Sequence, residues 1–197
     1  IKKDTMLPNY YGVKAFLSRV GNMIYYSDSM EVRQAGDGQA LTWIGVEAKL
    51  RQRFLRHLYL ESAVTFQNGS VEGDFPLELY AESVPEFFGK ASVFFERSNM
   101  KIAKRLRIGV ELVYNSAFPG QSIDPASGEF FPTPYVVPAY PRANAFFILH
   151  PPRSNVYVWF RFQHMNEQFP YRGYYTTPFY PMLERTFSFG ANWTFFD

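Results

Sequence analysis

The chain lacks several features that would define its class. None of its 197 residues is cysteine, so disulfides and thiolate metal sites are excluded. No run of about 18 apolar residues occurs, which argues against a transmembrane helix. Leucine and alanine are few, which disfavours a helical bundle. With a net charge of +2 and no block of lysine and arginine, no nucleic-acid partner is predicted.

Sequence motifs for catalysis are also missing. The chain has no G-x-S-x-G, H-E-x-x-H or phosphate-binding glycine pattern. His57, His150 and His164 have no metal-ligand spacing, and the turn at 124–128 offers one carboxylate, too few for calcium. We therefore predict no catalytic residues, no metal and no cofactor, and a protein that is not an enzyme.

Aromatic residues, in contrast, are abundant. The chain has 21 Phe, 14 Tyr and 3 Trp, or 19% in all, which suits strands and membrane interfaces. The last segment alternates strictly: Phe187, Phe189, Ala191, Trp193 and Phe195 fall on one face, and polar residues or glycine on the other. This period of two predicts a strand. We interpret it as the closing strand of a transmembrane barrel, with its aromatic face in lipid.

Alternation of the same kind predicts about nine strands in a single domain, 1–197. They are 11–18, 21–28, 43–51, 57–67, 87–96, 105–115, 142–150, 155–163 and 186–195. An odd number is unusual for a bacterial barrel. One strand is then miscounted in a closed barrel of eight or ten, or the chain is the C-terminal portion of a larger barrel. The start at Ile1 rather than Met favours the second interpretation.

The predicted connections alternate between short and long. The short ones are 19–20, 52–53, 98–101 and 151–153, and the long ones are 29–40, 68–85, 116–141 and 165–184. Segregated loop lengths are typical of outer-membrane barrels, which have short periplasmic turns and long external loops. The prediction is therefore an all-β, transmembrane, antiparallel up-and-down β-barrel. Proline argues against strands in the last two long loops, whose aromatics indicate packing over the barrel mouth.

The last eighteen residues resemble a known family. The segment Tyr180-Pro-Met, followed by Arg185, Phe187, Phe189-Gly190, Trp193 and Phe195-Phe-Asp197, is similar to the end of the Bacteroidota outer-membrane proteins called "putative porins". The segments 109–118, 140–150 and 174–178 are similar too. The resemblance implies an outer-membrane barrel recognised by the barrel-assembly machinery through Ser188, Gly190, Trp193, Phe195 and Phe196. Most such signals end in Phe, whereas this chain ends in Asp197. Family members are usually longer than this chain.

Charged residues on the inward faces of the predicted strands are the candidate functional residues. Facing lipid, several of them would each cost roughly 2–4 kcal/mol at the midplane. They form a ladder of cross-strand ion pairs or tune the selectivity of a channel, and the two roles are compatible. Seven bases against four acids predict a weak anion preference. The candidates are Lys14, Glu47, Lys49, Arg51, Glu61, Lys90, Glu96, Arg105, Arg107, Glu111 and Arg161.

These features predict a porin-like channel in the cell outer membrane for passive diffusion of small hydrophilic solutes. The alternative is a non-conducting structural or docking barrel in a larger envelope or secretion complex, with loops 116–141 and 165–184 as its binding surface. An energy-coupled transporter would require an N-terminal plug, which this sequence does not show. Lipid and the assembly machinery are the expected partners. The predicted aromatic girdles consist of Tyr25, Tyr26, Phe66, Tyr114 and Trp193.

Overall fold

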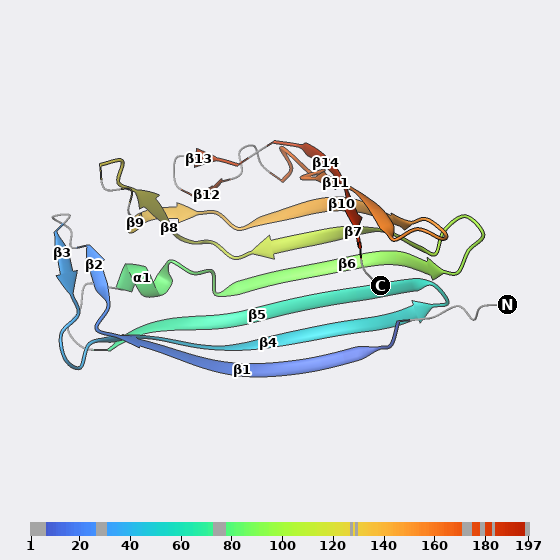
Figure 1. The fold of residues 1–197 in the computed structure, drawn as a ribbon. Coiled ribbons are helices and arrows are strands. Elements are labelled where there is room, and N and C mark those ends of the chain that lie inside the picture. Colours follow the sequence, from blue (N-terminus) through green and yellow to red (C-terminus); the bar gives the residue numbers. More distant parts are fainter. Residues whose placement is uncertain are drawn as a thin grey trace.

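The computed structural model is dominated by one antiparallel sheet of eight long strands (Figure 1). It describes residues 7–26, 31–72, 78–126, 128, 130–170, 175–177, 180–182 and 184–195. Each long strand pairs with the next one along the chain, so the sheet is an up-and-down meander, as predicted. Its strands are β1 (Tyr10–Gly21), β4 (Ala40–Leu55), β5 (Leu58–Glu72), β6 (Phe87–Ser98), β7 (Arg105–Asn115), β10 (Tyr140–His150), β11 (Val156–Gln163) and β14 (Thr186–Trp193).

The predicted strand at 21–28 is wrong as a member of this sheet. β1 continues through the expected turn at 19–20 and pairs with β4 as far as Gly21, opposite Ala40. Asn22 then turns the chain with a positive φ of 53°. The following residues form a small separate hairpin of β2 (Ile24–Tyr26) and β3 (Val32–Gln34). The described main sheet therefore has eight strands instead of nine.

Loop lengths alternate in the structure as the sequence predicted. The long connections, 22–39, 73–86, 116–139 and 164–185, alternate with the short ones, 56–57, 99–104 and 151–155. The small elements within the long connections gather at one end of the sheet, on the left in Figure 1. The first short turn lies at 56–57 instead of 52–53, because β4 continues to Leu55 through an irregularity in its register after Arg53. The sheet thus has two unlike ends.

Proline did not exclude strands from the long loops, so that prediction is wrong. β8 (Phe118–Ile123) and β9 (Phe130–Val137) form a two-stranded ladder. Pro119 lies opposite Val136, and the register shifts before Gln121. Proline is tolerated because each strand of an isolated pair has a free edge, where no amide hydrogen is needed. The loops are packed as expected: α1 (Glu78–Glu82) contacts both β8 and β9, and β12 (Tyr175–Thr177), which pairs with β13 (Tyr180–Pro181), contacts them as well.

One face of the main sheet is apolar and exposed to the surroundings. Leu17, Phe66, Val110 and Trp193 leave between 54% and 68% of their area uncovered. A continuous apolar surface of this kind would make a protein aggregate in water, whereas lipid covers it favourably. The face also includes Val13, Ile44, Val46, Ile108, Leu112, Phe187 and Phe189. We call it the apolar face.

The opposite face carries the buried side chains. Tyr59, Phe94, Tyr140 and Asn144 are each only 1% exposed, and the strand register places all four on this face. We call it the polar face. The arrangement inverts a soluble sheet, which would bury its most apolar residues. Among the described residues, no helix is long and apolar enough to cross a membrane.

Three of the five predicted girdle aromatics lie on the apolar face. Phe66 and Trp193 are exposed on the apolar face, and Tyr114 lies on the same face beside Phe87. The prediction for Tyr25 is wrong, because its side chain is buried in a small apolar cluster with Ala35, Leu41 and Ala81. The side chain of Tyr26 lies outside the described part of the structure.

Candidate functional site

All eleven predicted inward-facing charges lie on the polar face. Residues that are paired across neighbouring strands point to the same side of a sheet, so the register decides this directly. Their strands are β1, β4, β5, β6, β7 and β11. The residues are Lys14, Glu47, Lys49, Arg51, Glu61, Lys90, Glu96, Arg105, Arg107, Glu111 and Arg161. Period-two alternation was enough to assign them to one face. A shift of the alternation by one residue in a strand would have moved all predicted charges of that strand to the apolar face.

Two neighbouring rows of paired residues dominate this face. The Lys49 row crosses six strands through Gly12, Lys49, Ala63, Lys90, Val113 and Arg142. The Glu111 row runs beside it through Tyr10, Arg51, Glu61, Ser92, Glu111 and Asn144. The first row contains three bases and no acid. The second contains two carboxylates, and both are held by bases.

Each of the four carboxylates on the polar face forms an ion pair. Glu47 accepts from Lys49 at 2.8 Å, and Glu61 pairs with Arg51 across β4 and β5. Glu96 is bound by two arginines: Arg105 Nη2 at 2.6 Å and Arg107 Nε at 2.5 Å. Its side chain is 4% exposed, which is tolerable because two guanidinium groups supply charge and hydrogen bonds together.

Glu111 is the centre of an extended polar network. Lys90 Nζ lies 2.7 Å from one carboxylate oxygen, and Arg161 Nη2 lies 2.6 Å from the other. Asn144 donates to Glu111 at 3.0 Å and accepts from the backbone N–H of His164. Tyr140 Oη is 2.8 Å from the Nε2 atom of His164. The network therefore ties the wall of β6, β7 and β11 to the start of the last long loop.

Aromatic residues on the polar face closely approach glycines of the neighbouring strand. A Cβ at Gly109 would come within 2.5 Å of Phe94 Cβ, and one at Gly190 within 2.6 Å of the Trp159 ring. Only glycine leaves room for such close approach, and covering it with an aromatic offsets its weak strand propensity. The Phe94 ring also lies 4.3 Å from the Arg107 guanidinium carbon. The pairs are Phe16 and Gly45, Trp43 and Gly69, Phe94 and Gly109, and Trp159 and Gly190.

The helix α1 folds onto the polar face at the long-loop end. Trp43 donates its indole N–H to the carbonyl of Ala81 at 3.3 Å. A Cβ at Gly69 would lie 2.5 Å from that same carbonyl oxygen. Ala81 is buried together with Leu41. Because Leu41, Trp43 and Gly69 all belong to the polar face, the loop between β5 and β6 reaches inward over the sheet.

The predicted assembly residues divide between the two faces of β14. Ser188 and Gly190 lie on the polar face, opposite Arg161 and Trp159. Trp193 and Phe195 are exposed, 64% and 71%, and their rings stack with centroids 4.6 Å apart. Phe196 lies outside the described residues. The structure gives Gly190 a packing role beneath Trp159, beyond any role in assembly.

Sequence reasoning missed several residues of the polar face. Arg142 and Asn144 follow the same period-two alternation as their neighbours on β10. That alternation would have been enough to predict that they lie on the polar face. Tyr10, Ser92 and Trp159 carry no charge and were passed over for that reason. In the part of the chain that the structure describes, no group of three His, Asp or Glu side chains could hold a metal ion.

A sheet with one charged face and one exposed aromatic face defines the class of outer-membrane barrel proteins. The family model described as "Putative porin" matches residues 5–197, and the chain belongs to this family. The match extends well beyond the C-terminal resemblance. It indicates a porin-like protein of the outer membrane.

Among solved structures, the fold is similar to a chain of the FpvAI–pyocin S2 complex. The TM-score is 0.60 at 8% identity, and the match covers 94% of this chain and 25% of that chain. This chain thus spans about a quarter of the length of the structure it matches. At such low identity the likeness concerns the fold alone. No curated protein matches the sequence.

Proposed function

We propose that the chain forms part of the wall of a water-filled channel in the outer membrane, through which small hydrophilic solutes diffuse passively. The observation that carries the proposal is the division of one sheet into two chemical faces. All eleven candidate charges share the polar face, and the exposed large apolar residues of β7 and β14 share the other. Charges are stable against water, and aromatics against lipid. The lipid of the outer membrane is accordingly a partner of the apolar face.

The channel should favour anions, since bases outnumber acids on the polar face. Every acid there is already paired: Glu96 and Glu111 each contact two bases. Ion pairing cancels much of the acids' attraction for cations, whereas Lys14 and Arg142 add positive charge beyond these pairs. A lumen lined with surplus positive charge concentrates anions and lowers their barrier to entry.

The reversal potential in a planar bilayer tests this function. The purified protein is inserted into the bilayer under a tenfold gradient of potassium chloride. We expect discrete conductance steps and a reversal potential with the sign of chloride permeation. Cation selectivity would contradict the charge argument, and the absence of any conductance would contradict the channel itself.

A docking barrel is the second candidate, favoured by the order of the long-loop end. There β8 and β9 pack against both α1 and β12. We propose that envelope proteins would bind it through loops 116–141 and 165–184. Photo-crosslinkers at Phe130 and Tyr135, which are exposed on β9, would capture a partner in intact cells. Specific capture by a non-conducting protein would favour this role over diffusion.

Assembly into the membrane is proposed to use the end of β14. Its polar Ser188, its Gly190 and the exposed pair of Trp193 and Phe195 supply the features that the barrel-assembly machinery reads. The Trp193 and Phe195 rings stack on each other, and both are exposed. They are available to a partner before lipid covers them.

A further inference from the structure

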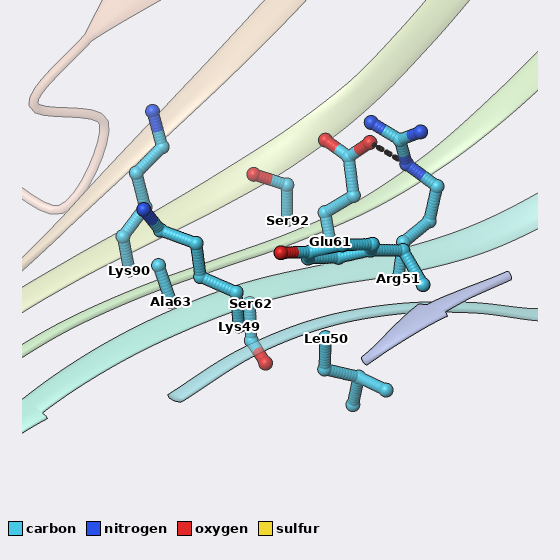
Figure 2. Close-up of a pocket in the computed structure, with 9 residues that line it drawn as sticks. Lys49, Leu50, Arg51, Glu61, Ser62, Ala63, Lys90 and Ser92 are labelled. Carbon is cyan, nitrogen blue, oxygen red and sulfur yellow. Dashed lines mark hydrogen bonds and ion pairs between the residues drawn. The ribbon is translucent and has the colours of Figure 1, made fainter. Parts of the chain in front are cut away.

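A hollow on the polar face is lined by several cationic side chains, with small residues between them. It has a volume of about 240 Å³ and is lined by Tyr10, Lys49, Arg51, Ala63, Lys90 and Ser92, among others. Lys49 and Lys90 belong to the same row, with Ala63 between them on β5. Because Ala63 has only a methyl group, the space between the two lysines is open. Figure 2 shows both lysines on one side of the hollow and the Arg51–Glu61 pair on the other.

We propose that this hollow binds small solutes through their phosphate or carboxylate groups, and so sets which anions the channel prefers. The proposal rests on the channel function proposed above and names its substrate class. An oxyanion between two ammonium groups would receive charge-assisted hydrogen bonds from both. The hollow is sized for such a group and its immediate neighbours rather than for a polymer.

Donors remain after the lysines have formed their ion pairs. An ammonium group has three donors. Lys49 meets Glu47 at 2.8 Å and Lys90 meets Glu111 at 2.7 Å, so each contact uses one donor and leaves two. The lysine side chains are about half exposed, at 51% and 49%. The remaining donors can therefore contact a solute while both ion pairs stay formed.

The surrounding groups disfavour a cation in the same place. Glu61 is the acid in the hollow, and its carboxylate is neutralised by Arg51. Arg51 makes this contact through Nε, the inner nitrogen of its guanidinium group. Ser92 and Tyr10 add hydroxyl groups, which donate to oxyanions as readily as they accept. An adjoining hollow shares Glu61, Lys90 and Ser92 and adds Arg107, Arg161 and Glu111. Glu111 is paired with Lys90 and Arg161, so this second hollow offers a solute no unpaired carboxylate of β7.

Equilibrium titration with inorganic phosphate tests the site in the folded protein, independently of conduction. The protein is kept in detergent with about 0.15 M sodium chloride, which screens exposed lysines. Calorimetry should show saturable binding to the unmodified protein. The variant K49Q/K90Q should weaken it at least about tenfold, because two charges near the ligand are lost. The variant K49R/K90R keeps both charges and should retain binding.

The control is K101Q/K104Q, which removes two exposed lysines from the short connection between β6 and β7. It lowers the net charge equally without touching the hollow and should bind phosphate normally. An equal loss in this control would overturn the proposal by showing that binding is nonspecific. Should K49Q/K90Q fail to fold, the single variants K49Q and K90Q provide the same comparison, each with a smaller expected loss.

A parallel titration with succinate distinguishes the two sources of oxyanion. Binding of both ligands supports a site for oxyanions in general, and binding of phosphate alone supports a site for phosphorylated solutes. Binding of neither overturns the site, even if the protein conducts chloride. Phosphate binding by a protein that never conducts would instead overturn the channel and leave the site standing. The binding and conductance measurements together therefore distinguish a failure of the proposed site from a failure of the proposed channel.

Discussion

Glu111 shows how a single acid stabilises a wall made mostly of bases. Its side chain is 8% exposed and is shared by Lys90, Arg161 and Asn144. Burying a carboxylate is costly unless charge and hydrogen bonds compensate. Here two bases and an amide do so, and they come from three different strands. Glu111 therefore fixes the relative positions of β6, β10 and β11 around β7.

We expect Glu111→Ala to destabilise the folded protein by about 2 kcal/mol. The value is below that of a fully buried pair, because Lys90 and Arg161 are partly exposed and water can solvate them. Asn144, 1% exposed, would lose the acceptor for its amide. Urea unfolding in lipid vesicles measures the change. Glu111→Gln should cost less, since its carbonyl can still accept from Asn144, and equal losses would contradict the role of the amide.

At the scale of elements, α1 is the one described helix and lies where it would narrow a lumen. The hydrogen bond from Trp43 and the close approach of Gly69 fasten it to the polar face. A hollow of about 270 Å³ lies beside it, lined by residues of α1, β4, β5, β8 and the loops, including Glu82 and Glu86. The inward position follows from Gly69, because any side chain there would push Ala81 away.

Replacing residues 78–82 with a glycine–serine linker should raise single-channel conductance, since the helix no longer occupies the polar face. Trp43→Phe should act in the same direction more weakly, because it removes one hydrogen bond worth about 1 kcal/mol. Conductance in planar bilayers is the measurement. Unchanged conductance in the linker variant would show that α1 lies outside the conducting path.

The last strand of the main sheet, β14, combines packing with proposed recognition. Gly190 is needed beneath Trp159, and Phe195 is exposed beside Trp193. We expect G190A/F195A to lower the amount of protein in the outer membrane several-fold, because both the packing of the strand and its proposed signal are altered. Immunoblots of membrane fractions would show this. F187A is the control on the same strand, 60% exposed but outside the signal, and an equal loss there would contradict the recognition role.

For the whole molecule, the division into two faces predicts the orientation of the sheet in the membrane. Val110 lies at the middle of β7 and is 54% exposed on the apolar face. Val110→Arg should cost roughly 2–4 kcal/mol, because it places a charge in hydrocarbon. Thr65→Arg, on the polar face beside Glu47, should be nearly neutral. Unfolding from lipid vesicles distinguishes them, and equal costs would refute the assignment of the faces.

Much of the fold followed from local sequence pattern. Alternation assigned Lys14, Glu96 and Arg161 to one face because side chains of a strand point alternately to its two sides, whatever the strand pairs with. The alternation of short and long loops followed from where strand periodicity stops, but the turns predicted at 19–20 and 52–53 lie within β1 and β4. The segment 21–28 was misassigned because aromatic residues suit a hairpin and a main-sheet strand equally well, and only pairing partners distinguish them. Prolines misled in β8 and β9 because sequence cannot show which edge of a strand is free.

The sequence by itself therefore determined the class of protein, the eight long strands and the two faces of the main sheet, because a period of two is a property of each strand alone. Tertiary structure decided which residues meet. Lys49 and Lys90 are far apart in the chain and share a row only through the register of β4, β5 and β6. Glu111, Asn144 and His164 likewise form one network only once β7 and β10 are paired and the last loop is docked. Register depends on contacts between distant segments, and no local pattern contains it.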